Sequence, residues 1–578
     1  MGMLCALALG APVFHEQAQA QVALPGSGNN APAAAVRILS DQDVKTYKAI
    51  FDAQARADWA TADKLVKRLQ DRVLLGHVLY ERYMHPTAYR TSYNEAAAWM
   101  QAYADHPGAD RIYRLGQLRR VKGGPKLVAP VPIDPPPPPQ KPVHYTKEEL
   151  ARIRDLRQTQ TTIRQLLRRS ETPQAEKRFW AAEQRGLFDR ETFGRTLASI
   201  AASYYFDGDN AKAMALGTLS GATEGRGRYL GNWFAGLAAW RSDDCKRAAG
   251  HFEKAAEAAG DANPWDMAGA AFWAARARLA CREPEKVNAL LDAAARHNRT
   301  FYGLVAMRQL GRDIVFSWDY PPLSEQDLKK VTREPGVRRA IALAQVGRAE
   351  WADLEMRYVW RRAKSEEIHP PLLGLASRLN LPSTQVRGAK VLERKQIVLP
   401  ESTLYPVPDW QPAGGFKLDR ALIFAFMRQE SEFFTRAESH AGARGLMQLM
   451  PATASYISRD RTLQRNKERL YDPAYNMALG QQYIEYLMSK EEMGGNLFFI
   501  ASAYNGGPGN LSRWLQRIDF RNDPLLFIES IPLDETRDYV EKVIANMWIY
   551  RMRMGQSVAS LDAVAAGEWP VYIPQDKH

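Results

Sequence analysis

One glutamate in this sequence of 578 residues has the setting of a general acid. Glu430, in the segment FMRQESEFF (426–434), follows the apolar residues Phe426 and Met427 at helical spacing, so we expect it on the buried face of a helix. Burial strips water from a carboxyl group and raises its pKa, which suits acid catalysis near neutral pH. Glu432, two residues further on, should face away. The alternative interpretation is a structural glutamate with an arginine partner.

Small and polar residues follow this glutamate. In SHAGARGLMQLMPATA (439–454) the glycines permit a tight connection and the proline suits the start of a helix. Ser439, Gln448 and Met450 can therefore project from short segments close to Glu430.

Two later segments add further polar groups. AYNGGPGN (503–510) ends an apolar helix with Tyr504 and Asn505, and its glycines would let a large ligand approach the backbone. IPLDETRDYV (531–540) opens a long helix with Glu535 in its first turn. Glu535 could also be no more than a favourable charge at a helix N-terminus.

Taken in order, the segments RQESEF, GARGLMQLMPATA, AYNGGPGN and IPLDETRDYV resemble the catalytic domain of the soluble lytic murein transglycosylases, over roughly Leu418 to Arg551. The resemblance implies a lysozyme-like helical domain with Glu430 as the catalytic acid and base. It implies that the substrate contacts come from Ser439, Gln448, Met450, Tyr504, Asn505 and Glu535. His440 departs from the pattern, where a small residue or proline is expected, and could narrow a subsite.

The implied reaction is cleavage of the MurNAc-β-1,4-GlcNAc bond of peptidoglycan by intramolecular transfer, which leaves 1,6-anhydro-MurNAc ends. Such a reaction needs one carboxyl group, no metal and no cofactor. Conventional glycosidases use two carboxyl groups. A goose-type lysozyme is the first alternative, with Glu535 as the second carboxylate to test. A non-catalytic scaffold that binds the cell wall is the second.

The rest of the chain is predicted to be helical. A repeat aligns Phe234 with Trp273 and Phe252 with Leu291, an offset of 39 residues, which is typical of a helical solenoid. We therefore expect an all-α protein, a superhelix that could close into a ring, followed by the lysozyme-like domain. The predicted parts are a signal peptide (1–20), a superhelical domain (21–335) with a proline-rich insertion (128–143), a helical linker (336–400), the catalytic domain (401–560) and a tail (561–578).

Two cysteines remain after the signal peptide. Cys245 and Cys281 should lie in the inter-helix turns of consecutive repeats, where neighbouring turns could come within bridging distance. A disulfide and a pair of packed thiols both fit the sequence.

The net charge and the first residues of the chain bear on where the protein is located and what it binds. The net charge of +13 is spread among acidic residues and shows no nucleic-acid signature, so a negatively charged cell-wall polymer or membrane surface is a better match. The start of the chain has a short apolar run and a small-x-small triplet at Ala18 to Ala20, which indicates secretion to the periplasm. No transmembrane span is predicted. The expected partners are peptidoglycan glycan strands, with cell-wall synthesis enzymes as a further class.

Overall fold

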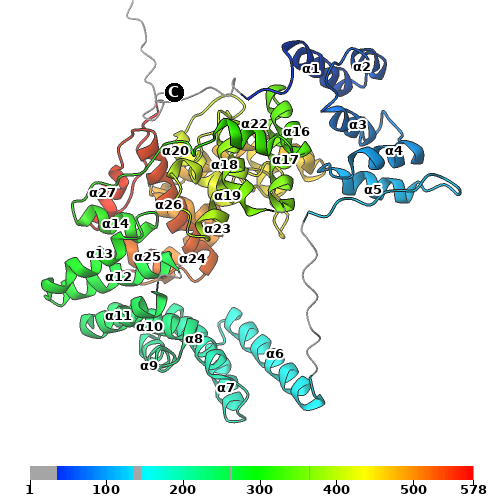
Figure 1. Ribbon diagram of the computed structural model, residues 1–578. Helices are drawn as coiled ribbons and strands as arrows, with labels where there is room; N and C mark the ends of the chain where they lie inside the picture. The colour runs from blue at the N-terminus through cyan, green and yellow to red at the C-terminus, as the bar shows by residue number, and fades with distance from the viewer. Residues whose placement is uncertain (1–35, 134–144, 261–262, 364, 577–578) are drawn as a thin grey trace, which may run out of the picture.

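The computed structural model describes residues 36–133, 145–260, 263–363 and 365–576. Figure 1 shows that these residues are built from helices throughout. Within the described ranges the only β contacts are isolated bridges, so the all-α prediction is confirmed. No helix in this part of the chain is long and apolar enough to cross a membrane. The predicted signal peptide and most of the proline-rich insertion lie outside the described residues.

An N-terminal lobe (36–133) contains five helices. They are α1 (Asp41–Ala55), α2 (Trp59–Val66), α3 (Leu75–Tyr83), α4 (Tyr93–Tyr103) and α5 (Ala109–Leu118). Ser92 and Glu95 form a capping box that satisfies the first backbone N–H groups of α4. The lobe rests on residues about 300 positions later in the sequence, because Gln345 Oε1 accepts hydrogen bonds from the backbone N–H groups of Ile38 and Leu39, each at 2.9 Å.

The next nine helices form an arc, the cyan-to-green part of Figure 1. They are α6 (Lys147–Arg168), α7 (Thr172–Glu183), α8 (Arg190–Phe206), α9 (Asn210–Gly221), α10 (Gly225–Arg241), α11 (Cys245–Ala259), α12 (Pro264–Ala280), α13 (Val287–Ala295) and α14 (Phe301–Gln309). From α8 to α13 each helix packs on the next, as expected for a solenoid. Small residues allow this: a Cβ atom on Gly231 would lie only 2.6 Å from the backbone oxygen of Gly217. The aligned repeat residues Phe234 and Trp273 are both buried.

A third group of helices connects the arc to the C-terminal region. It comprises α15 (Glu325–Val331), α16 (Pro335–Gln345), α17 (Ala349–Arg362), α18 (His369–Arg378) and α19 (Pro382–Glu393). Helices α16 and α17 form the surface on which the N-terminal lobe rests. The N-terminal lobe thus rests on helices that lie in the predicted linker (336–400).

The C-terminal region holds the motifs of interest. Its helices are α20 (Arg420–Ser431), α21 (Pro451–Ser458), α22 (Pro473–Met488), α23 (Leu497–Gly506), α24 (Pro508–Arg517), α25 (Pro524–Glu529), α26 (Asp534–Arg553) and α27 (Ala559–Ala565). Short 3-10 turns across the chain are η3 (Pro284–Lys286), η4 (Glu366–Ile368), η5 (Glu401–Thr403), η6 (Arg461–Gln464), η7 (Lys467–Tyr471) and η8 (Glu491–Met493). Helix α14 of the arc docks on α26 and α27, and the ring of Phe301 stacks on Trp548 with centroids 5.1 Å apart.

The end of the chain packs against the rest of the C-terminal region. The sequence predicts a tail at 561–578, and the part of it that the structure describes, up to residue 576, contacts the C-terminal helices. Trp569 packs on Phe499 and Phe527, and the Tyr572 hydroxyl accepts a hydrogen bond from Asp419 N at 3.1 Å. These contacts join residues far apart in the sequence, so local sequence patterns did not reveal them.

Candidate active site

Glu430 lies in the last turn of α20. The helix ends one residue later, because Glu432 and Phe433 both take left-handed backbone angles, with φ of 49° and 61°. The Ser431 hydroxyl donates to the backbone oxygen of Leu446 at 2.8 Å and ties the helix end to the following turn. The position of Glu430 is therefore fixed by local backbone geometry on both sides.

Glu432 points away from Glu430 and has a different environment, as predicted. Its carboxylate forms ion pairs with Lys390 at 2.6 Å and with Arg387 at 3.1 Å. These cations help to keep the pKa of Glu432 below its usual value despite partial burial. Two glutamates in neighbouring positions thus have opposite electrostatic settings.

The carboxyl group of Glu430 is partly buried and bonded to a phenol. The Tyr539 hydroxyl donates a hydrogen bond to Glu430 Oε1 at 2.5 Å. Burial raises the pKa of Glu430 to about 8; the bond from Tyr539 opposes this shift, and the negative charge of Glu535 adds to it. No ion pair to Glu430 is found among the described residues. The structure therefore does not show the ion-paired alternative, and the raised pKa of Glu430 favours its protonated form near neutral pH.

Aromatic rings surround this carboxyl group. Tyr504, at the end of α23, lies edge-on to Phe426 with centroids 4.6 Å apart and is parallel to Tyr539 at 6.4 Å. Its hydroxyl donates to the backbone oxygen of Met447 at 2.7 Å. Tyr504 therefore links the helix that carries Asn505 to the turn that follows Glu430.

That turn holds three of the predicted residues in different ways. The Gln448 side chain donates to the backbone oxygens of Ala437 and Gly445, at 3.1 and 2.8 Å, so its amide nitrogen shapes the turn. Ser439 is exposed and its hydroxyl accepts from Ala443 N at 3.0 Å. Met450 is 40% exposed at the cap of α21. His440, beside Ser439, is also exposed.

The remaining predicted residues lie where α23 meets α26. Asn505 Oδ1 accepts a hydrogen bond from the Thr536 hydroxyl at 2.6 Å. Glu535 is exposed in the first turn of α26, and its charge acts on Glu430. Tyr539 was not predicted. It lies one helical turn after Glu535 in the quoted motif, and this i, i+4 spacing could have identified it.

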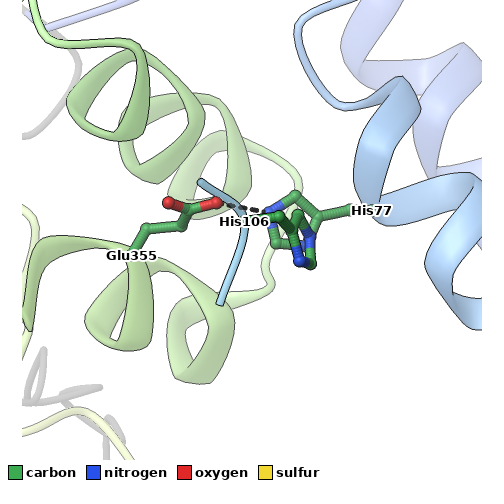
Figure 2. Close-up of side chains that lie close together, drawn as sticks. All are labelled: His77, His106 and Glu355. Atoms are coloured by element: carbon green, nitrogen blue, oxygen red, sulfur yellow. Dashed lines mark hydrogen bonds and ion pairs between the residues drawn. The ribbon is translucent and has the colours of Figure 1, made fainter. Parts of the chain in front are cut away.

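A second group of ionisable residues lies between the N-terminal lobe and α17. Figure 2 shows His77 and His106 facing Glu355, with His77 Nε2 bonded to the carboxylate at 2.8 Å. Their ligand atoms lie within 4.8 Å of one another, as a metal site would require. However, His106 Nδ1 accepts a hydrogen bond from Gly108 N at 2.8 Å, so the proton of the neutral ring is on Nε2.

This tautomer fits a metal poorly. A metal-binding histidine donates its second ring N–H to an acceptor, whereas His106 receives a proton donor there. Arg339 also occupies both carboxylate oxygens of Glu355, at 2.6 and 3.0 Å. The donor set is that of a buried structural ion pair.

The two cysteines are bonded to each other. Cys245 starts α11 and Cys281 caps α12, and a disulfide joins them with their Cα atoms 5.5 Å apart. The disulfide covalently links consecutive units of the helical repeat.

Comparison with known proteins assigns the class of the C-terminal region. Residues 411–526 match the transglycosylase SLT domain, and the site around Glu430 lies within and directly after this match. The C-terminal end of this helical chain is thus similar to a transglycosylase SLT domain.

The chain is also similar to individual proteins. It is 30% identical over 308 residues to the soluble lytic murein transglycosylase of Salmonella typhimurium, covering 52% of this chain and 45% of that protein. It is 29% identical over 281 residues to the Escherichia coli K12 protein of the same description, covering 47% and 41%. The aligned region thus spans less than half the length of either relative.

A solved structure matches most of the fold. The lytic transglycosylase Slt of Pseudomonas aeruginosa, in an inactive mutant form, superposes with a TM-score of 0.53 at 18% identity, covering 89% of this chain and 90% of that one. At this identity the match bears on the fold alone. It confirms the predicted architecture of a superhelix followed by a lysozyme-like domain.

Proposed function

We propose that this protein is a lytic transglycosylase that cleaves the MurNAc-β-1,4-GlcNAc bond of peptidoglycan, with Glu430 as its only acid and base. The observation that carries the proposal is the partly buried carboxyl of Glu430, which has a raised pKa and a phenol, not a cation, as its partner. The matched SLT domain and the two murein transglycosylase relatives support the choice of substrate.

In the first step Glu430 acts as the acid. Its proton passes to the bridging oxygen as the bond from that oxygen to C1 of MurNAc breaks. The carbonyl oxygen of the sugar's own N-acetyl group can bond to C1 and carry the developing positive charge. Since the raised pKa of Glu430 favours its protonated form near neutral pH, this step needs no prior proton uptake.

In the second step the same group acts as the base. The Glu430 carboxylate accepts the proton of the MurNAc 6-hydroxyl, and that oxygen attacks C1, which releases the N-acetyl oxygen and closes the 1,6-anhydro ring. The Tyr539 hydroxyl stabilises the carboxylate between the two steps. An intramolecular hydroxyl can have an effective concentration of order 10⁵ M or more, so neither water nor a second carboxylate is needed.

The location follows from the same proposal. Peptidoglycan lies outside the cytoplasmic membrane, and the disulfide between Cys245 and Cys281 suits an oxidising compartment. The apolar start of the sequence is consistent with export to the periplasm.

Mass spectrometry of muropeptides released from purified peptidoglycan tests the proposal. A lytic transglycosylase gives fragments one water lighter than hydrolytic products, without a reducing MurNAc end. Reducing ends would instead indicate a lysozyme-type hydrolase and make Glu535 the candidate second carboxylate. A folded protein that releases nothing would indicate a binding scaffold.

A further inference from the structure

Five tyrosines form a continuous row that starts at the candidate active site. Successive ring centroids are 6.4 Å (Tyr539 to Tyr504), 5.2 Å (Tyr504 to Tyr483), 6.3 Å (Tyr483 to Tyr486) and 5.7 Å (Tyr486 to Tyr456) apart. The row leaves Glu430, crosses α22 and ends on α21. The exposed fraction of the side chain rises along the row, from 4% at Tyr539 to 65% at Tyr456.

The exposed end of the row opens into a pocket. The pocket has a volume of about 770 Å³, within the usual range for ligand sites. Two tyrosines, Tyr456 and Tyr486, line it together with the side chains of Arg459, Arg461 and Gln482. Most of its lining residues lie on α21, the helix that Met450 caps, and just after it, so the pocket lies next to one of the predicted substrate contacts.

The two outer rings are fixed in place without being buried. The Tyr456 ring lies edge-on to the Tyr486 ring, with centroids 5.7 Å apart, and the ammonium group of Lys490 lies over the Tyr486 ring at 4.6 Å. Gln482 donates to the backbone oxygen of Ile457 at 3.2 Å and joins α22 to α21. A ring that only filled the core would be covered by other side chains, whereas Tyr456 presents its ring to solvent.

We propose that this end of the tyrosine row is a distal subsite for the glycan strand. The apolar face of a pyranose ring would stack on Tyr456, while Gln482 would bond to sugar hydroxyl groups. Arg459 and Arg461, both exposed, would pair with the carboxylates that MurNAc and its peptide carry. Four centroid steps of 5.2 to 6.4 Å separate Tyr539, beside Glu430, from Tyr456, so a strand that reaches from Glu430 to this subsite is several sugars long. This inference rests on the proposed function, because it takes peptidoglycan as the substrate.

Binding measurements test the subsite independently of turnover. In the Glu430→Gln background, long uncross-linked glycan strands and a short peptidoglycan tetrasaccharide are titrated against the full chain with Tyr456 intact or changed to Ala. The Ala change should weaken the binding of long strands about tenfold and leave the tetrasaccharide unchanged. Tyr456→Phe keeps the ring and should bind long strands within about twofold of the parent protein.

The control is Tyr145→Ala, which removes another exposed tyrosine far along the chain. Equal weakening of both ligands by Tyr456→Ala, or unchanged binding of long strands by a folded variant, would overturn the proposed subsite. The two proposals can fail separately. If the Glu430→Gln protein binds long strands through Tyr456 but the wild-type protein cleaves nothing, the subsite is supported and the proposed activity is wrong.

Discussion

Two carboxyl groups, the partly buried Glu430 and the buried Glu355, differ in their partners. Glu355 is fully buried but lies against the guanidinium of Arg339 and the ring of His77. Glu430 is less buried, and among the described residues its carboxyl group bonds to the Tyr539 hydroxyl alone; the negative charge of Glu535 lies close enough to raise its pKa. A cation stabilises a buried carboxylate, whereas a phenol and a nearby anion leave it as an acid with a raised pKa.

Burial alone therefore does not identify a catalytic acid. Burial with a cation produces an element that holds two regions together, here the N-terminal lobe and α17. Burial without a paired cation favours the protonated form and leaves a candidate proton donor. Perturbed groups of the second kind are the better functional candidates, and the predictions below test whether the two carboxyl groups differ in this way.

The largest expected effect is on activity. Glu430→Gln should lower kcat on purified peptidoglycan by about 10³-fold or more, because the amide keeps the size of the side chain but has no proton to transfer. The thermal unfolding midpoint should not fall. Glu432→Gln is the matched control, since Glu432 is paired with Lys390 and should retain activity. Near-normal turnover by Glu430→Gln would end the assignment.

Glu355→Gln should instead lower stability and leave activity almost unchanged. It leaves Arg339 and His77 without their carboxylate and should lower the free energy of unfolding by about 3 kcal/mol. The N-terminal lobe should become sensitive to proteolysis while kcat stays within about twofold of wild type, because Glu355 and Glu430 share no bonding partner among the described residues. A stable but inactive variant would show that the two carboxyl groups are not separate in role.

Tyr539→Phe sharpens the account of Glu430. Removing the hydroxyl takes away the bond that lowers the pKa of Glu430, so this pKa should rise further. The ionised Glu430 formed in the first step also loses its donor, and kcat should fall about 10- to 100-fold. The alkaline limb of kcat/KM should move to higher pH. A limb that moves to lower pH would contradict the assigned direction of the hydrogen bond.

The smallest effect is on the pH dependence of stability. Burial lowers the pKa of both His77 and His106, so the unfolded chain takes up protons first and stability should fall as the pH drops below about 6.5. Glu430 acts in the other direction: its folded pKa is raised to about 8, so stability should fall as the pH rises from near 4.5 toward that value.

Unfolding midpoints measured across this pH range check both signs. Glu430→Gln should abolish the loss of stability at alkaline pH and leave the loss of stability at acid pH unchanged. His77→Gln should reduce the acid loss only. If Glu430→Gln changed the acid side instead, the raised pKa of Glu430 would be refuted.

The sequence predicted the helices and the side of α20 on which Glu430 lies, because apolar spacing and turn residues are local signals. It also marked Tyr504 and Glu535 through their motifs. It did not predict that Gln448 would use its amide to hold the turn, or that Tyr539 would be the partner of Glu430. Those contacts depend on how α20, α23 and α26 pack, which no single segment encodes.

Contacts between distant parts of the sequence could not be predicted either. The docking of the N-terminal lobe on α16 and α17 joins residues such as His77 and Glu355, and the packing of Trp569 on Phe499 fixes the chain end. In both places the sequence shows ordinary helix and loop patterns. The partner is set by the tertiary fold.

The pH dependence of kcat/KM with a soluble glycan substrate tests the central claim most directly, because it reports the protonation state of the essential acid in the free enzyme. The account predicts full activity at neutral pH and a decline whose midpoint lies near 8, where Glu430 loses its proton. Activity that falls away already above about pH 4.5, the range of an ordinary glutamate, would show that Glu430 is ionised at neutral pH and is not the proton donor described here.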